Sequence, residues 1–527
     1  MQPSPPRGFE STPQAPKNTN PFQAHPKIKP FISRYCQEKN LNENILTRLS
    51  ILRSKALKGV KFQSNTKQGF SAKHNRRFRE ILREQNSLSR LCYQFLSYRL
   101  LENLCSASKL ESLSCLTFSN LNLFNQGRFY RHLKVLLKFL VSLKNLANFS
   151  VQSSFHSFGD PKILFRLLRS LLCLKKLQSF SLNGVALRPF CVNDEQIFFS
   201  SLQKMTQLRT LKLSFEGSIL YDEQNIMNKL ALVLPKLTHL VEIDLDFTNG
   251  QIIIQESALL KLFQSFRTIS SLSDISLNFS KCFVFRRHND EVLRNCLLCL
   301  NPSSIRNLNL GFYTNLHSES LVKIFQVFSR FTSLSVLHLN LRNCETINDK
   351  DTSQLCEALS RLISLSSLCL IFPHKAEAEV IVRNIASTLK VLKNLQQLKL
   401  KLTGEIRTSP SQFQGFFSSL RNLRSLKSFD MDFSWNQSIQ DDVLEGLGEA
   451  LKELTDLQAL SLDFSYNKKI THIGIEGLCC GIGQRYSLSS LTFNLVDLEG
   501  RSERSMESIA RIFRSLDSLW SVDLSLY

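Results

Sequence analysis

Apolar positions along most of the chain follow one recurring pattern, L-x-x-L-x-L-x-F with conservative apolar replacements. The residues that open the copies lie 29 to 33 positions apart and number fourteen: Leu113, Leu146, Leu177, Leu208, Leu240, Leu272, Ile305, Leu334, Leu365, Leu395, Leu426, Leu457, Leu488 and Leu519. A spacing this regular indicates one structural unit that is repeated along the chain.

Each repeat has two parts with different periodicities. The part ending in L-x-L-x-F alternates apolar and polar residues, which predicts a short strand with one buried face. The part before it has apolar residues at helical spacing, as at Leu321, Ile324, Phe325 and Phe328, preceded by Ser, Thr or Asp residues that can cap a helix. A strand and a helix in about 31 residues cannot bury their own apolar face. We therefore expect an α/β solenoid with a parallel sheet inside and helices outside.

The repeats resemble leucine-rich repeats of the long, helix-containing (ribonuclease-inhibitor-like) class, to which ribonuclease inhibitor and the Ran GTPase-activating protein belong. The resemblance covers Leu113 to Tyr527. It implies a horseshoe with the parallel sheet on the concave face, the helices on the convex face, and a protein partner bound to the concave face.

The chain departs from that family in the turn after the strand. The family has Asn or Cys three residues after the last strand leucine, where it forms a hydrogen-bonded ladder. The corresponding positions here are mostly other residues, namely Glu216, Thr248, Ser280, Tyr313, Ser434 and Ser465. An additional Phe or Leu two residues after that leucine predicts a lengthened strand and a rebuilt turn.

Composition divides the chain into three expected segments. Residues 1–38 contain 8 of the 14 prolines and little apolar content, which predicts a disordered tail. Residues 39–87 are expected to be a basic helical segment, and residues 88–527 a leucine-rich-repeat domain of about 14 repeats. Helical spacing over 42–57 and over 88–104, where Leu91, Phe95 and Leu101 lie near one stripe, predicts two helices before the first strand.

Positive charge is concentrated near the N-terminus. The chain has 66 Lys and Arg against 44 Asp and Glu, and residues 1–100 alone contain 19 Lys and Arg with five Glu. The densest cluster is a candidate basic patch of Lys73, Arg76, Arg77 and Arg79. Such a patch can contact nucleic acid or serve as a nuclear import signal. A solvated flank that keeps the chain in solution is the alternative.

The expected concave face is formed by the residues between the apolar positions of each strand, because side chains alternate along a strand. They give two columns that are almost wholly polar. The candidate partner-binding residues in these columns are Asp244, Asp246, His338, Lys399, Lys401, Asp430, Asp432 and Asp463. Neighbouring strands lie about 4.8 Å apart, so the two lysines face aspartates of the next strand.

Two interpretations of these charges stay open. One is a cross-strand charge ladder that contributes modestly to stability. The other is an acidic patch (Asp430, Asp432 and Asp463) that receives a basic partner or the chain's own basic N-terminal segment. Asp244 and Asp246 form a smaller, separate acidic spot, and His338 is a lone imidazole that we expect to be a polar surface residue.

Motifs for catalysis or cofactor binding find little support. The C-x-x-C of Cys296 and Cys299 has no second cysteine or histidine pair, which favours core thiols over a zinc site. The glycines of 446–448 and 481–483 lack the Lys-Ser/Thr of a phosphate-binding loop. We predict no catalytic residue, metal or cofactor.

The predicted function is therefore that of a non-enzymatic scaffold for protein–protein interaction. The absence of a signal-peptide pattern and of about 20 consecutive apolar residues, together with irregularly spaced cysteines, predicts an intracellular protein, cytoplasmic or nuclear, without a membrane segment. Alternatives are a regulatory adaptor, a protein similar to GTPase activators, or nucleic-acid contact through the basic segment. The last strand, SVDLSLY, leaves a sheet edge that could mediate self-association.

Overall fold

The computed structural model describes the residues 59–62, 90–93, 113–119, 129–152, 161–183, 192–215, 223–248, 253–280, 283–284, 291–312, 318–344, 347–374, 378–404, 410–436, 439–483, 487–498 and 503–525. The expected Pro-rich tail of residues 1–38 and the candidate basic patch of Lys73, Arg76, Arg77 and Arg79 lie outside them.

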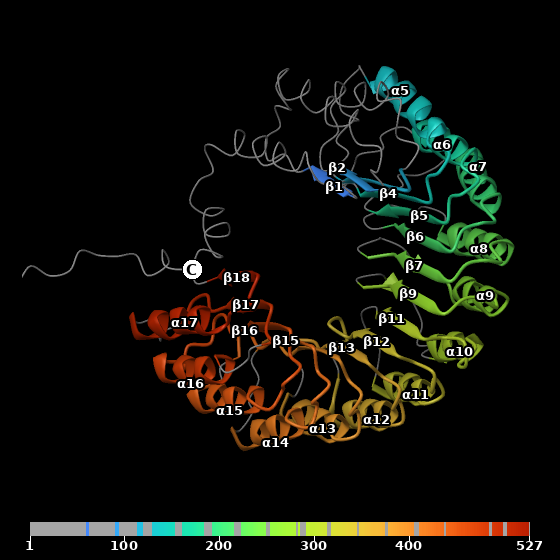
Figure 1. Cartoon of the computed structure of the whole chain (residues 1–527). Helices are drawn as coiled ribbons and strands as arrows, with labels where there is room; N and C mark the ends of the chain where they lie inside the picture. The colour runs from blue at the N-terminus through green and yellow to red at the C-terminus, as the bar shows by residue number, and fades with distance from the viewer. Residues whose placement is uncertain are drawn as a thin grey trace, which may run out of the picture.

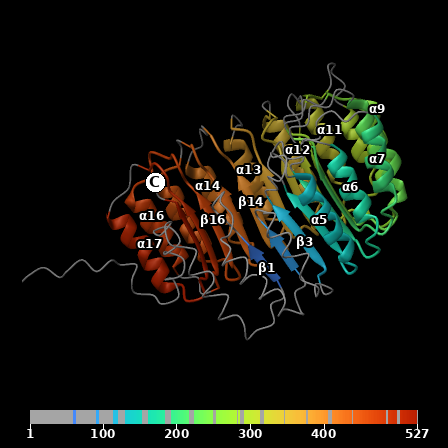
Figure 2. The same cartoon turned by 90° about the horizontal axis from the view of Figure 1, so that it is seen from above.

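The described residues form a leucine-rich-repeat-like solenoid. Its strands line the inside of an arc and its helices cover the outside (Figure 1). Seen from above, the strands run side by side across the inner wall (Figure 2). All strand pairs are parallel, and the single large sheet has 16 strands in the order β1-β2-β3-β4-β5-β6-β7-β9-β11-β12-β13-β14-β15-β16-β17-β18. The predicted α/β class with one long parallel sheet and alternating helices is confirmed.

The strands of this sheet are short. They are β1 (Gly59–Phe62), β2 (Arg90–Tyr93), β3 (Cys115–Ser119), β4 (Asn148–Gln152), β5 (Ser179–Asn183), β6 (Thr210–Ser214), β7 (Glu242–Asp246), β9 (Asp274–Asn278), β11 (Asn307–Gly311), β12 (Val336–Asn340), β13 (Ser367–Ile371), β14 (Gln397–Lys401), β15 (Ser428–Asp432), β16 (Ala459–Asp463), β17 (Ser490–Asn494) and β18 (Ser521–Ser525). Two further strands, β8 (Ile253–Ile254) and β10 (Phe283–Val284), pair only with each other.

Helices connect successive strands on the outer side. They are α5 (Phe129–Ser142), α6 (Pro161–Leu171), α7 (Val192–Gln203), α8 (Glu223–Val233), α9 (Glu256–Arg267), α10 (Glu291–Cys299), α11 (Ser318–Phe328), α12 (Asp349–Ser360), α13 (Ala378–Leu389), α14 (Pro410–Leu420), α15 (Asp441–Leu451), α16 (His472–Ile482) and α17 (Glu503–Ser515), with a short 3₁₀ turn at Leu234–Lys236.

The repeat period predicts the fourteen strands from β3 to β18 that belong to the large sheet. Each of the fourteen apolar marker residues lies just before one of them. The strands pair in register, so that Asp244 lies opposite Lys212 on one side and Ser276 on the other. Equivalent residues of successive repeats therefore form straight rows along the solenoid.

Two strands at the N-terminal end of the sheet were not predicted. Arg90–Tyr93 forms β2 and pairs with β3, so the helix expected over 88–104 is wrong at these residues. Gly59–Phe62 forms β1 within the segment expected to be helical. The signal was present in the sequence, since Leu88-x-x-Leu91-x-Tyr93 and Leu57-x-x-Val60-x-Phe62 repeat the strand pattern. Pairing with β2 satisfies the backbone groups on the open side of β3, which outweighs local helical spacing.

Phenylalanine side chains form rows in the core between the sheet and the helices. Phe215, Phe247 and Phe279 are all but fully buried, and their rings stack at centroid distances of 5.2 and 5.5 Å. Such aromatic contacts contribute about 0.5–1.5 kcal/mol each beyond the burial of apolar area. The Phe residues that end the pattern in these three repeats thus join one repeat to the next.

Backbone pairing continues past the end of the strands, as the additional Phe had suggested. The amide of Phe247 donates to the carbonyl of Asn278 at 2.8 Å, and the amide of Phe433 donates to that of Asp463 at 2.9 Å. The expected lengthened strand is confirmed by these bonds.

An asparagine ladder is present in part, two residues beyond the positions where the family pattern placed it. Asn467 is fully buried, and its side-chain amide donates to the carbonyls of Phe433 (3.0 Å) and Phe464 (2.8 Å). Its side-chain oxygen accepts from the amide of Asn436 at 2.6 Å. The additional strand residue moves the ladder along the chain, so this turn keeps the hydrogen bonds that the sequence pattern had seemed to lose.

Replacing Asn467 by alanine should lower the free energy of unfolding by about 2–4 kcal/mol, because two buried carbonyls and one amide lose their partner. The control is Asn422→Ala, which removes one hydrogen bond at an exposed position and should cost at most about 0.5 kcal/mol. Urea denaturation followed by circular dichroism measures both. Equal midpoints for the two variants would contradict the ladder.

Two of the glycines that the sequence analysis had considered for phosphate binding lie where α15 meets α16. A Cβ atom on Gly481 would overlap the backbone of Gly448, and one on Gly448 would overlap the carbonyl of Gly477. The absence of side chains therefore lets the two helices approach each other closely, which is a packing role.

Gly481→Ala should destabilise the protein, since the added methyl group meets rigid backbone of the neighbouring helix. We expect a loss of about 1–3 kcal/mol. Gly415 of α14 is the matched control, because a Cβ there meets nothing within 4 Å. Gly415→Ala should raise stability by about 0.5–1 kcal/mol through helix propensity. Thermal unfolding should shift in opposite directions for the two variants; a shift in the same direction would argue against the close approach.

Candidate binding face on the inner wall

The inner wall carries the two predicted columns and a third that the sequence analysis missed. Within β7, Ile243 and Leu245 point into the core while Asp244 and Asp246 are half-buried on the inner wall. The residue that opens each strand faces the same way, as Glu242 does in β7. Extending the alternation of side chains by two residues toward the start of each strand predicts this third column from the sequence.

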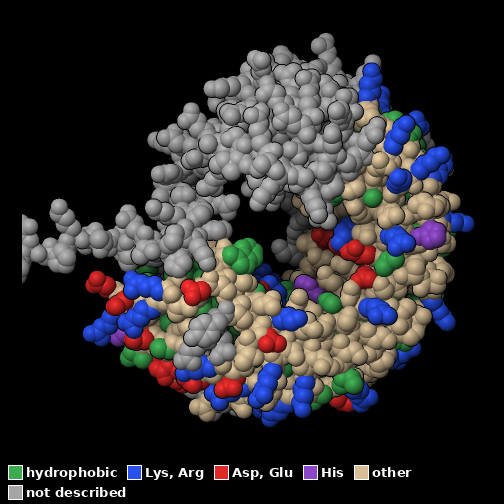
Figure 3. Space-filling view, in the orientation of Figure 1, with side chains coloured by type: hydrophobic (Ala, Val, Ile, Leu, Met, Phe, Trp, Pro, Cys, Tyr) green, Lys and Arg blue, Asp and Glu red, His purple; other side chains and the backbone are tan. Residues whose placement is uncertain are grey.

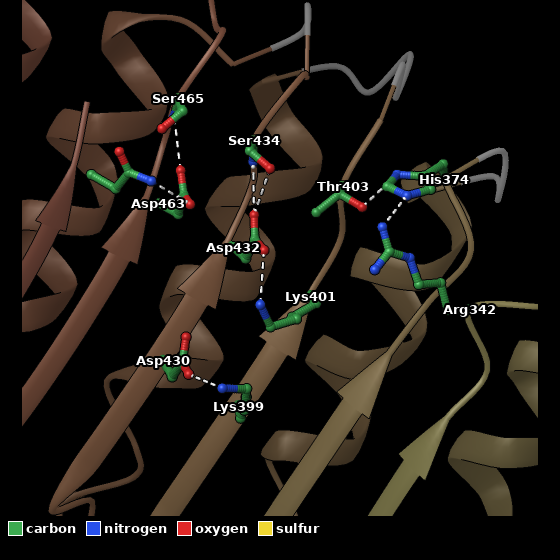
Figure 4. Close-up of polar contacts among 11 residues, drawn as sticks. Arg342, His374, Lys399, Lys401, Thr403, Asp430, Asp432, Ser434, Asp463 and Ser465 are labelled. Atoms are coloured by element: carbon green, nitrogen blue, oxygen red, sulfur yellow. Dashed lines mark hydrogen bonds and ion pairs between the residues drawn. The ribbon is translucent and has the colours of Figure 1, made fainter. Parts of the chain in front are cut away.

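Lysine and aspartate side chains pair across β14 and β15, as Figure 4 shows. Lys399 forms an ion pair with Asp430, and Lys401 forms one with Asp432 at 3.1 Å. The Lys399, Lys401 and Asp430 side chains are 26 to 40% exposed, so each pair contributes at most about 1 kcal/mol. Of the two interpretations, this geometry supports the cross-strand charge ladder. Two of the three aspartates of the acidic patch, Asp430 and Asp432, already have a basic partner.

Asp432 and Asp463 also close the turn that follows their strand. Asp432 accepts a hydrogen bond from the amide of Ser434 at 3.1 Å, and Asp463 accepts one from the amide of Ser465 at 3.0 Å (Figure 4). Asp463 accepts a second hydrogen bond from the side chain of Asn494 at 2.8 Å. These are Asx turns, in which a side chain bonds the backbone two residues later.

The same turn recurs along the second column. The side chains of Asp246, Asn278 and Asn340 accept from the amides two residues later, at 2.9 to 3.2 Å. An Asp or Asn at the end of a strand, often followed two residues later by Ser or Thr, was the sequence signal for this role. The role is structural, and it leaves fewer of the predicted residues available for a partner.

Asp432→Ala should therefore cost more stability than Asp430→Ala. The first removes an ion pair and the turn contacts of a nearly buried carboxylate, for an expected loss of about 1–3 kcal/mol. The second removes one partly exposed ion pair and should cost about 0.2–1 kcal/mol. Chemical denaturation of the two variants under identical salt gives the comparison, and a larger loss for Asp430→Ala would contradict the turn role.

A hollow with a volume of about 320 Å³ opens on the inner wall between β5 and β13. It brings together Asp244, Asp246 and His338, which the sequence analysis had placed apart as an isolated acidic spot and a lone imidazole. Figure 3 shows acidic and histidine side chains on this inner side of the arc. Polar groups dominate the lining, which is completed by Asn183, Leu213, Ser214, Ser276, Asn278, Asn309, Gly311, Asn340 and Ile371.

Gly311 of β11 lies in the lining of the hollow beside Asn278. A Cβ atom at this position would overlap the side-chain oxygen of Asn278 and approach the hydroxyl of Ser280. The missing side chain therefore lets the Asn278 side chain lie over the strand.

Burial changes the ionisation of two groups in the hollow. Burial raises the pKa of Asp244, and a hydrogen bond from Ser276 and the charge of Lys212 lower it in part. Lys212 forms its ion pair with Glu242. Burial, helped by the charge of Lys399, lowers the pKa of His338, so its imidazole is neutral at pH 7. The Nε2 atom of His338 is buried and has no hydrogen-bond partner among the described residues.

A second feature that the sequence analysis missed lies where the strands end. Trp435 and Tyr466 adopt positive φ angles of 64° at equivalent positions of neighbouring repeats. Gly404 and Asp497 also have positive φ angles, of 108° and 55°, at the equivalent positions of the repeats before and after them. The two aromatic rings stack at 4.0 Å, and Trp435 is 55% exposed. This turn suits Gly or Asp better than a bulky residue, and the chain instead presents an aromatic pair there.

After the end of β13, His374 is held between two side chains (Figure 4). Its Nε2 lies 2.8 Å from the guanidinium of Arg342, and its Nδ1 lies 2.7 Å from the hydroxyl of Thr403. Since a guanidinium can only donate, Nε2 accepts and Nδ1 carries the proton.

The cysteines of the C-x-x-C motif pack as the sequence analysis expected. Cys296 is fully buried in the core, and Cys299 packs against it. Burial raises the pKa of both thiols. No group of three or more His, Cys, Asp or Glu residues that could hold a metal ion occurs in the part of the chain that the structure describes. Among the helices described, none is long and apolar enough to span a membrane.

The edge strand β18 is less covered than the strands before it. Leu524 is half-buried, whereas the equivalent Phe493 of β17 is fully buried. Trp520, which precedes the strand, is 67% exposed. Self-association through this edge stays a prediction.

Comparison with known proteins gives structural similarity only. No protein-family model matches the chain, and no curated protein matches it. Among solved structures, TLR13 in a complex with ssRNA13 has a TM-score of 0.36 at 15% identity, covering 85% of this chain and 57% of that chain. Rad7 in its yeast complex with Elc1 has a TM-score of 0.37 at 16% identity, covering 90% and 96%.

Toll of Drosophila, in its complex with Spatzle, has a TM-score of 0.31 at 14% identity. That match covers 91% of this chain and 56% of the Toll chain. The chain thus spans just over half the length of the TLR13 and Toll chains. The description of the fold rests on the repeat topology of the chain itself.

Proposed function

We propose that this chain is a non-enzymatic scaffold whose inner wall binds a protein partner. The observation that supports this most is the inner wall itself, a continuous polar surface on strands held in register from β3 to β18. A specific protein interface needs about 800 Å² on each partner. A surface carried by paired strands loses little conformational entropy when it binds.

The polar groups in the hollow favour binding over catalysis. Asp244 lies on β7 and His338 on β12, three places apart in the strand order. The Nε2 atom of His338 has no hydrogen-bond partner among the described residues, so the hollow shows no histidine paired with a nucleophile through that atom.

The finer assignments are also proposals. The full helices and the period of about 31 residues favour the ribonuclease-inhibitor-like class of leucine-rich repeats. The regulatory adaptor and GTPase-activator alternatives rest on that resemblance alone. Nucleic-acid contact through Lys73, Arg76, Arg77 and Arg79 rests on residues outside the described part of the chain.

Site-specific photo-crosslinking tests the binding face. A photoreactive amino acid at Ser276 or Ser461 on the inner wall should crosslink one and the same partner protein in cells. The control is Gln264, an exposed residue of the outer helix α9, which should give no such product. Crosslinks to that partner from Gln264 and none from the inner wall would move the interface to the convex face and overturn the proposal.

A further inference from the structure

We propose that the hollow between β5 and β13 binds the guanidinium group of an arginine side chain that a partner protein inserts into the inner wall. This inference rests on the proposed function and names the chemistry of its central contact. It is drawn from the charge, the acceptors and the size of the hollow.

Among the described residues, the lining of the hollow contains two carboxylates and no lysine or arginine. These are Asp244 and Asp246, and Lys212, opposite Asp244 on the neighbouring strand, forms its ion pair with Glu242. His338 adds no positive charge while its imidazole is neutral. In the charge ladder of β14 and β15, by contrast, each aspartate already has its own lysine. A cation that enters the hollow therefore does not have to displace a basic residue.

The hollow also offers several hydrogen-bond acceptors on different sides. The carboxylate of Asp244 is one, and the Asp246 oxygen that does not close the turn after β7 is another. His338 lies in the lining with a buried Nε2 atom that has no hydrogen-bond partner among the described residues. The side-chain amide of Asn309 donates to the hydroxyl of Ser276 at 3.1 Å, so its carbonyl oxygen remains an acceptor. A guanidinium has five N–H donors in one plane and matches such a spread of acceptors. An ammonium has three donors around one point and matches it less well.

The size of the hollow fits one side chain. Its volume of about 320 Å³ is at the lower end of ligand pockets, which span about 300–1,000 Å³. Leu213 and Ile371 lie in the lining and can cover the methylene groups of an arginine stem.

The test uses the full chain and the probe Nα-acetyl-L-arginine N-methylamide, with binding followed by saturation-transfer NMR. The matching citrulline probe has nearly the same shape without the charge and should bind at least about tenfold more weakly. The variant Asp244→Asn should weaken arginine binding about tenfold or more. It should not lower the melting temperature, because the half-buried carboxylate is compensated only in part and the amide oxygen of Asn can still accept the hydrogen bond from Ser276. Asp430→Asn lies outside the hollow and should leave binding of the probe unchanged.

Three results would overturn the inference. These are equal binding of citrulline and arginine, unchanged binding by Asp244→Asn, and no binding of the arginine probe. If the probe fails while crosslinks from Ser276 and Ser461 persist, the arginine pocket is wrong and the protein-binding face stands. A full-chain variant with Arg76, Arg77 and Arg79 changed to alanine distinguishes the source of the arginine. Tighter probe binding by that variant would identify the chain's own basic segment as the occupant, against a partner protein.

Discussion

Each repeat of this chain has an apolar face that only its neighbours can cover. The leucines of the strand and the Phe that ends the pattern are buried against the helices of their own repeat and against the next Phe in the row. Because this burial works only when equivalent residues meet, the strands pair in register and the polar residues between the leucines must line the inner wall. The binding face is thus a geometrical consequence of the core.

The same constraint explains which inner-wall charges are structural. Every strand must end in a turn toward the outer side, and in several repeats an Asp or Asn of the second column closes that turn by accepting a backbone amide. Asp432 and Asp463 are therefore committed to the turn, and Asp430 to its lysine. Asp244 belongs to the first column, whose residues do not close a turn, and the cost of burying its half-buried carboxylate is offset only in part by Ser276 and Lys212. Such a cost is typical of groups kept for binding.

The sequence was sufficient for the period, the strand positions and the polar columns, since all three follow from alternation and spacing. The sequence led to a wrong prediction where one spacing of apolar residues fits both a helix and a strand. Leu91 and Phe95 are four residues apart, which suits a helix face as well as alternate strand positions, and only pairing with β3 decides for the strand. The asparagine ladder was missed because the additional Phe places Asn436 and Asn467 two residues beyond the positions of the family pattern.

The hollow could not have been predicted from one-dimensional spacing at all. Asp246 and His338 are 92 residues apart and belong to different strands, and they share one cavity because the arc of the sheet brings both to the same hollow (Figure 1). The curvature of the solenoid depends on the spacing between neighbouring helices and between neighbouring strands in every repeat. The sequence of a single repeat does not determine it. The charged residues of the inner wall therefore have two different roles. Where charges meet their complement on the next strand they form a ladder, and where the described lining of the hollow holds carboxylates but no lysine or arginine, charge stays available for another molecule.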